Sequence, residues 1–134
     1  MTDYTAFAQV KITSGLCEDV LCTAFEGGID YWIEGLSARR ERRDNDFSGF
    51  AYVGGTITPA DEDRGPMEIT IDLVAAGIAK ILEKGCAEKE VLILGPKRYG
   101  YLLGSVVDDD ASMIDADIAD VIVQVALFGE VVYG

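Results

Sequence analysis

The hydrophobic pattern at the start of the chain predicts a strand followed by a helix. Apolar and polar residues alternate over residues 7–12, as in a half-buried strand. The next apolar residues are three and four positions apart, which is the spacing of an amphipathic helix; they are Cys17, Val20, Leu21, Ala24 and Phe25. Thr13 or Ser14 can cap this helix, and Gly27-Gly28 ends it because glycine suits a helix stop.

A hairpin, a short strand and a second long helix are predicted next. Residues 29–36 and 47–57 carry aromatic and β-branched residues, and we expect them to pair with each other. Prolines frame the exposed connection at residues 58–66. Residues 67–71 then form a short strand that leads into a helix, and Gly85 ends this helix.

The pattern after Gly85 is mostly helical. Residues 91–94 are ambiguous between a buried strand and part of a helix. Pro96 suits the first turn of a helix in which Tyr99, Leu102, Leu103 and Val106 form an apolar stripe. Gly100 and Gly104 lie on another face of this helix, where a neighbouring backbone could approach closely.

The last predicted helix is apolar on nearly every side. Ser112 can cap it, and Asp117, Asp120 and Gln124 are its polar positions. Its apolar residues are Ile114, Ile118, Val121, Ile122, Val123, Val125, Ala126, Leu127 and Phe128. Such a helix either lies between two layers of its own domain or forms a subunit contact, so residues 114–128 are a candidate homo-oligomer interface.

These elements, with a final strand at residues 131–133, predict the fold class. We expect a single α+β domain over residues 1–134. Its antiparallel sheet comes from a hairpin-rich N-terminal half, and about four helices, mostly in the C-terminal half, pack with that sheet. A chain of 134 residues is of single-domain length.

The charge of the chain restricts its partners. Asp and Glu number 24 against 11 Lys and Arg, so the net charge is −13. This balance opposes direct nucleic-acid binding, which needs cations to displace counterions from phosphates, and it disfavours an anionic membrane surface. A protein with a basic surface would be attracted. The alternative interpretation is that the acidity only keeps the chain soluble.

The acids are concentrated late in the chain, where no Lys, Arg or His follows Arg98. The densest run is Asp108, Asp109 and Asp110, which we predict to be a binding face for a partner. Carboxylates also bind Mg²⁺ and Ca²⁺, but this run lacks the alternating ligands and central glycine of a calcium loop. We therefore expect no metal.

Four arginines form the one concentrated basic feature, in a polar segment that we interpret as a solvated hairpin tip. They are Arg39, Arg40, Arg42 and Arg43. Arginines in such a cluster can grip a phosphate, a nucleic acid or an acidic partner. They can instead pair with the nearby acids Glu41, Asp44 and Asp46, or with the acidic run of a neighbouring copy.

The chain lacks a recognisable catalytic set. It has no histidine, and its three cysteines, Cys17, Cys22 and Cys86, form no metal-binding or disulfide pattern. Cys17 begins a helix, where a thiolate is favoured, but its apolar position indicates a core residue. No glycine motif for nucleotide phosphates is present, so we expect no cofactor. These features favour a reduced, cytoplasmic protein that is not an enzyme.

Aromatic residues in the hairpin region support a rival hypothesis. Tyr31 and Trp32 follow the Gly27-Gly28 turn, so a pocket for a small ligand or nucleotide there is the main alternative. Core packing of these rings is the simpler interpretation.

Two segments resemble small, uncharacterised proteins of bacteriophage or prophage accessory regions. They are residues 24–32 (AFEGGIDYW) and residues 123–134 (VQVALFGEVVYG). The group has no established activity, so the resemblance carries over no functional residue. It implies a bacterial cytoplasm and an action on host or phage machinery.

The leading hypothesis is a non-enzymatic accessory protein that binds another macromolecule through its acidic face. The alternatives are the small-ligand pocket and a structural, self-assembling subunit. No apolar run approaches the length that crosses a bilayer, and we expect no membrane partner.

Overall fold

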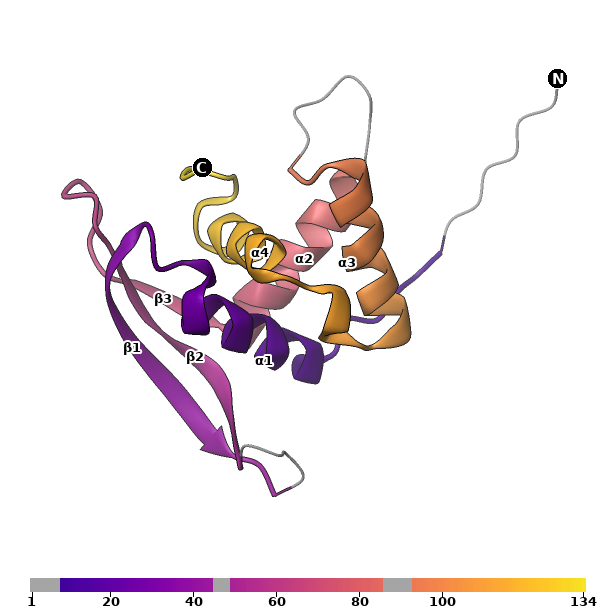
Figure 1. Cartoon of the computed structure of the whole chain (residues 1–134), viewed down its shortest axis with the longest axis horizontal. Helices are drawn as coiled ribbons and strands as arrows, with labels where there is room; N and C mark the ends of the chain where they lie inside the picture. The colour runs from indigo at the N-terminus through magenta and orange to yellow at the C-terminus, as the bar shows by residue number, and fades with distance from the viewer. Residues whose placement is uncertain (1–7, 45–48, 86–92) are drawn as a thin grey trace, which may run out of the picture.

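The predicted α+β class is confirmed by a computed structural model, which describes residues 8–44, 49–85 and 93–134 (Figure 1). The described elements are, in order, α1 (Ser14–Thr23), η1 (Ala24–Gly28), β1 (Ile33–Arg42), β2 (Phe50–Pro59), β3 (Met67–Thr70), α2 (Ile71–Lys84), α3 (Pro96–Asp108), η2 (Ala111–Met113) and α4 (Ala116–Phe128). Three of the four α-helices follow the sheet in the chain, as predicted.

The three described strands form one antiparallel sheet in the order β1-β2-β3. The helices gather on one side of this sheet in Figure 1. Ile57 of β2 and Ile69 of β3 are fully buried in the core. The register shifts between Arg39 and Arg40, where Gly54 lies opposite Arg39. Gly54 has φ +152°, and a Cβ there would lie 2.6 Å from the carbonyl oxygen of Ile69, so this position requires glycine.

The first helix forms as its sequence predicts. Thr13 is the cap, because its hydroxyl accepts a hydrogen bond from the backbone N–H of Leu16 at 3.1 Å. Cys17, Val20 and Leu21 are fully buried. The helix continues as η1, which has a wider, π-helical turn and ends where Gly27 adopts φ +157°.

Helix α4 lies inside the fold, which explains its unusual apolarity. It packs against α2, α1 and η1. Gly77 of α2 permits close packing, since a Cβ there would lie 3.0 Å from the carbonyl oxygen of Ile122. Ile118, Ile122 and Val123 are fully buried within the chain itself. The apolar pattern is therefore explained without a subunit contact, and the homo-oligomer through residues 114–128 stays a prediction.

Two predicted strands are wrong. Residues 8–13 and 131–134 have no regular secondary structure, although their apolar residues alternate. Alternation alone does not make a strand, because the backbone also needs a neighbouring strand to pair with. Residues 131–134 instead bind to a side chain of α4, as described below. Phe7 lies outside the described residues.

Strand β1 is shifted along the chain from its predicted position. It begins at Ile33, so Tyr31 and Trp32 lie in the preceding turn and not in a strand. It extends to Arg42, so Arg39, Arg40 and Arg42 are strand residues and not a loop tip. Pairing with β2 continues to Phe50, and this backbone pairing overrides the polar character of the segment.

In the helical half, the cap of the last helix and the surroundings of Gly100 and Gly104 differ from the prediction. Asp115, not Ser112, caps the last helix, and its carboxylate accepts from the backbone N–H of Ile118 at 2.8 Å. Gly100 and Gly104 are exposed, and a Cβ at either position would meet no atom within 4 Å. Helix α3 begins at Pro96 as predicted. Of the ambiguous residues 91–94, the first two lie outside the described residues, and the others form a bend.

Candidate functional site

A buried carboxylate organises the side chains around Tyr31 and Trp32. Asp120 is only 7% exposed and accepts three hydrogen bonds. The Tyr31 hydroxyl donates at 2.5 Å and the Trp32 indole Nε1 at 2.8 Å. The Nε2 of Gln124 donates at 3.0 Å. All three donors are neutral, so hydrogen bonds rather than an ion pair compensate for the burial of this carboxylate.

The local structure places these four side chains together. Asp120 and Gln124 are four residues apart in α4, so they lie one above the other on the same face of the helix. Tyr31 and Trp32 follow η1 in a turn that packs against this face. Trp32 is 3% exposed, whereas Tyr31 is 57% exposed, so this turn has one buried and one solvent-facing ring.

The segment after Gly129 completes the network. The Oε1 of Gln124 accepts from the backbone N–H groups of Val132 and Tyr133, both at 2.8 Å. The Nε2 of Gln124 donates to the backbone carbonyl of Tyr133 at 3.0 Å. The Tyr133 ring stacks on Trp32, with centroids 5.0 Å apart and planes 9° from parallel. One side-chain amide therefore holds the backbone of Val132 and Tyr133 beside a buried tryptophan.

An open hollow of about 500 Å³ lies beside this network. Its lining residues are Tyr31, Trp32, Ala60, Asp61, Val132, Tyr133 and Gly134. The predicted pocket near the Gly27-Gly28 turn is therefore only partly matched, because these glycines do not line it. Gly28 is buried instead, and a Cβ there would lie 2.9 Å from the Ala116 carbonyl oxygen.

The Tyr31 hydroxyl is a donor and not a base. Partial burial, followed by the hydrogen bond to Asp120 and the negative charge of that carboxylate, raises the pKa of Tyr31 to about 12. It therefore stays protonated at neutral pH. The hollow offers aromatic faces and the carboxylate of Asp61.

The acidic turn, Asp108 to Asp110, connects α3 to η2. Asp108 ends α3, and Asp109 adopts a left-handed conformation with φ 51°. The Asp109 carboxylate accepts from the Thr13 hydroxyl at 2.5 Å, and Asp110 accepts from the backbone N–H of Ser112 at 2.9 Å. The hydrogen bonds from Ser112 lower the pKa of Asp110. All three acids are exposed, and none forms an ion pair with a described residue.

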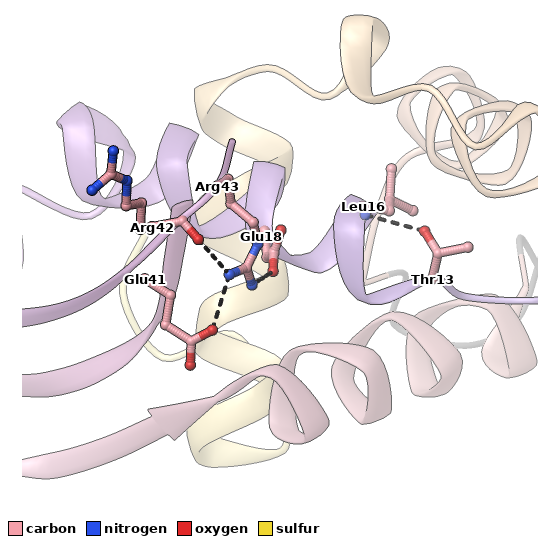
Figure 2. A network of polar contacts seen from close by, with 6 residues as sticks. All are labelled: Thr13, Leu16, Glu18, Glu41, Arg42 and Arg43. Carbon is pink, nitrogen blue, oxygen red and sulfur yellow. Dashed lines mark hydrogen bonds and ion pairs between the residues drawn. The ribbon is translucent and has the colours of Figure 1, made fainter. Parts of the chain in front are cut away.

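The arginines, in contrast, are engaged within the chain. Arg43 lies between two carboxylates (Figure 2), with 2.6 Å to Glu18 and 3.0 Å to Glu41. The hydrogen bond to Glu18, then that to Glu41, raises the pKa of Arg43. The other ion pairs between described residues are Arg39–Glu68 (2.7 Å), Arg42–Asp44 (3.6 Å), Arg64–Asp61 (3.9 Å) and Arg98–Asp117 (2.8 Å).

The remaining arginine of the cluster, Arg40, lies 4.8 Å over the ring of Phe50. The interpretation of the basic segment as self-paired is thus confirmed for Glu41 and Asp44, while Asp46 lies outside the described residues. The basic strand and the acidic turn do not meet. Each contacts α1 instead. Arg43 donates to Glu18 of α1, and Asp109 accepts from Thr13, the cap of α1.

The described residues contain no metal cluster, and Cys17 is not activated as a nucleophile. No group of three or more Cys, Asp or Glu in residues 8–44, 49–85 and 93–134 is arranged to hold a metal ion. Cys17 is fully buried, and this burial, followed by the charge of Glu18, raises the pKa of its thiol to about 11. This burial confirms that Cys17 is a core residue. A thiol with that pKa is almost wholly protonated near neutral pH, so it is a poor nucleophile.

Comparison of the chain with protein-family models, curated proteins and solved structures found no match. Among the described residues, every helix is too short or too polar to cross a membrane.

Sequence reasoning located Tyr31 and Trp32 but missed the residues that organise them. The sequence identifies Asp120 and Gln124 only as polar positions of the last helix, yet both are buried. A usable signal was present: two polar residues with helical i, i+4 spacing in a helix that is otherwise apolar. Buried polar groups need partners, so this pair indicates an internal hydrogen-bond network.

Proposed function

We propose that this protein acts by binding another protein that has a basic surface, and that the acidic turn is its contact. The proposal rests on a difference in intramolecular partners between the arginines and the three acids of this turn. Each arginine already has an intramolecular partner, whereas Asp108, Asp109 and Asp110 have no cation partner among the described residues. The turn therefore presents three consecutive acids without an ion pair among the described residues, in a chain whose net charge is −13.

The rigidity of the turn supports a role in recognition. Asp109 is fixed by its hydrogen bond to Thr13 and Asp110 by its hydrogen bonds to Ser112, so these carboxylates are oriented before a partner arrives. Preorientation lowers the entropy cost of binding, and surface potential accelerates the encounter of oppositely charged proteins. The resemblance of residues 24–32 and 123–134 to phage accessory proteins implies a partner in the bacterial cytoplasm, and both the resemblance and the location stay predictions.

A capture experiment with a charge-matched control tests the proposal. The test variant carries Asp108→Asn, Asp109→Asn and Asp110→Asn, in which asparagine keeps the hydrogen-bond acceptors. The control carries Glu34→Gln, Glu62→Gln and Asp63→Asn, which remove the same charge from exposed positions elsewhere. We expect one bacterial protein to be retained at low salt by the native chain and the control but lost with the test variant. Equal retention by the two variants would reject the acidic turn as the contact.

The second candidate function is binding of a small ligand in the Tyr31–Tyr133 hollow. Its volume of about 500 Å³ and its aromatic lining favour this candidate. A thermal-shift screen with nucleotides, cyclic nucleotides and divalent cations tests it. A saturable rise of several degrees that Tyr31→Ala abolishes would support the hollow, whereas a flat screen leaves the acidic turn as the better candidate.

A further inference from the structure

A hollow of about 160 Å³ lies between α1, η1 and the start of β2. It shares no lining residue with the Tyr31–Tyr133 hollow, and none of the three acids of the acidic turn lines it. Sites for drug-sized ligands are larger, at roughly 300–1,000 Å³. A cavity of about 150 Å³ nevertheless holds a molecule as large as benzene. This hollow can therefore take one small molecule or one small chemical group.

The helical wall of the hollow is acidic. Glu18, Asp19 and Glu26 line it, and no Lys or Arg is among its described lining residues. Arg43 pairs with Glu18 at 2.6 Å from outside the hollow (Figure 2). None of the ion pairs between described residues includes Glu26. Carboxylates on one side of a helix repel each other, so a cation in the hollow would relieve this repulsion.

Two aromatic rings of β2 also line the hollow. Phe50 and Tyr52 are two residues apart in the strand, so they lie on the same face of the sheet. Their centroids are 5.7 Å apart and their planes are 85° apart, so the two rings form a corner. The Arg40 guanidinium lies 4.8 Å over the Phe50 ring, but Arg40 does not line the hollow. Phe50 therefore already contacts one cation of the chain, and the hollow itself offers room for another.

Aromatic rings beside carboxylates favour one class of ligand. Ring faces attract cations, and they bind quaternary ammonium groups such as that of choline. A metal ion needs several oxygen ligands, and no group of three or more Cys, Asp or Glu among the described residues is arranged to supply them. We therefore propose that this hollow binds a small alkylammonium cation. The ammonium group lies beside the Phe50 and Tyr52 rings, and Glu26 balances its charge. The inference is independent of both functions proposed above.

Two compounds separate charge from shape in the native chain. They are choline and its uncharged isostere, in which a tert-butyl group replaces the trimethylammonium group. In a titration at constant ionic strength, followed by backbone amide NMR signals, choline should give saturable shifts concentrated in α1, η1 and residues 50–52. The isostere should bind at least about fivefold more weakly. Equal binding of the two compounds, or choline shifts spread over all exposed acids, would overturn the proposal.

Substitutions then test the acidic wall and the aromatic corner separately. Glu26→Gln removes one charge from the hollow, and Glu62→Gln is the matched control at an exposed position between β2 and β3. Phe50→Leu removes a ring but keeps an apolar side chain. Glu26→Gln and Phe50→Leu should each weaken choline binding by about threefold to tenfold, and Glu62→Gln should leave it unchanged. The Glu26 side chain is exposed, so an unchanged choline affinity in Glu26→Gln would overturn the proposal even if Phe50→Leu fails to fold.

Discussion

The indole N–H of Trp32 donates to the carboxylate of Asp120 at 2.8 Å, inside the fold and without a neighbouring cation. This hydrogen bond joins the turn after η1 to the middle of α4. It also fixes the plane of the indole on which Tyr133 stacks. The stability of this region therefore depends on a buried acid whose charge is balanced by hydrogen bonds alone.

Removing that acid should destabilise the protein strongly. Asp120→Ala leaves the buried donors of Trp32 and Gln124 without their acceptor, and we expect a loss of about 2–4 kcal/mol in the free energy of unfolding. Urea unfolding followed by circular dichroism measures this loss. Asp117→Ala, at an exposed position of the same helix, is the control and should cost much less. Equal losses in the two variants would contradict the structural importance of the Asp120 network.

Helices α2 and α4 should not tolerate an added methyl group at Gly77, where they pack closely. A Cβ at position 77 would lie 3.0 Å from the Ile122 carbonyl oxygen and 3.1 Å from the Ala126 nitrogen. We therefore expect Gly77→Ala to destabilise the protein by about 1–3 kcal/mol through overpacking. Gly104→Ala meets no atom within 4 Å on an exposed helix face and should stabilise it by about 0.5–1 kcal/mol. Thermal unfolding of both variants distinguishes close packing from simple helix propensity.

Alkaline pH should weaken the fold through Tyr31. The ordinary pKa of 10 rises to about 12 in the folded chain, because burial and the Asp120 contact disfavour the phenolate. Below pH 10 both states are protonated and the stabilisation is complete. Between pH 10 and 12 the unfolded chain loses its proton first, so stability falls as pH rises. Unfolding curves across this range should show a smaller loss for Tyr31→Phe than for the native chain.

The stability of the protein should depend more on Arg43, at the loop end of the β1–β2 hairpin, than on its neighbour Arg42. Arg43 binds Glu18 of α1 as well as Glu41 (Figure 2). The Arg42–Asp44 pair, in contrast, is local and almost fully exposed. Arg43→Ala should therefore lower the midpoint of thermal unfolding more than Arg42→Ala. High salt should narrow this difference, because partly exposed ion pairs are screened. An identical midpoint of thermal unfolding in both variants would show that the ion pair between Arg43 and Glu18 does not stabilise the fold.

Much of the fold could be predicted from local sequence rules. Thr13 at a helix start, Gly85 at a helix end and Pro96 in a first turn all have the structural roles that their chemistry favours. Helical spacing of apolar residues likewise identified α1, α2 and α4. These features succeed because each depends on neighbours within a few residues in the chain.

Several of the failures depend on hydrogen bonds or strand pairing with residues outside the local segment. The alternating residues 131–133 resemble a strand, yet their partner is the Gln124 side chain and not another strand. The arginines of β1 resemble a loop until their pairing with β2 is known. Asp120 was missed for the same reason, because its donors Tyr31 and Trp32 are 89 and 88 residues away in sequence. Hydrophobic pattern does not encode such partners.

The most direct test of the proposed function is the salt dependence of association between this chain and the basic protein that it captures. If the acidic turn is the contact, Asp108→Asn, Asp109→Asn and Asp110→Asn together should slow association several-fold at low salt and flatten its dependence on ionic strength. The charge-matched control, with Glu34→Gln, Glu62→Gln and Asp63→Asn, should stay close to the native chain in both respects. Identical association rates and salt slopes for the two variants would contradict recognition through Asp108, Asp109 and Asp110.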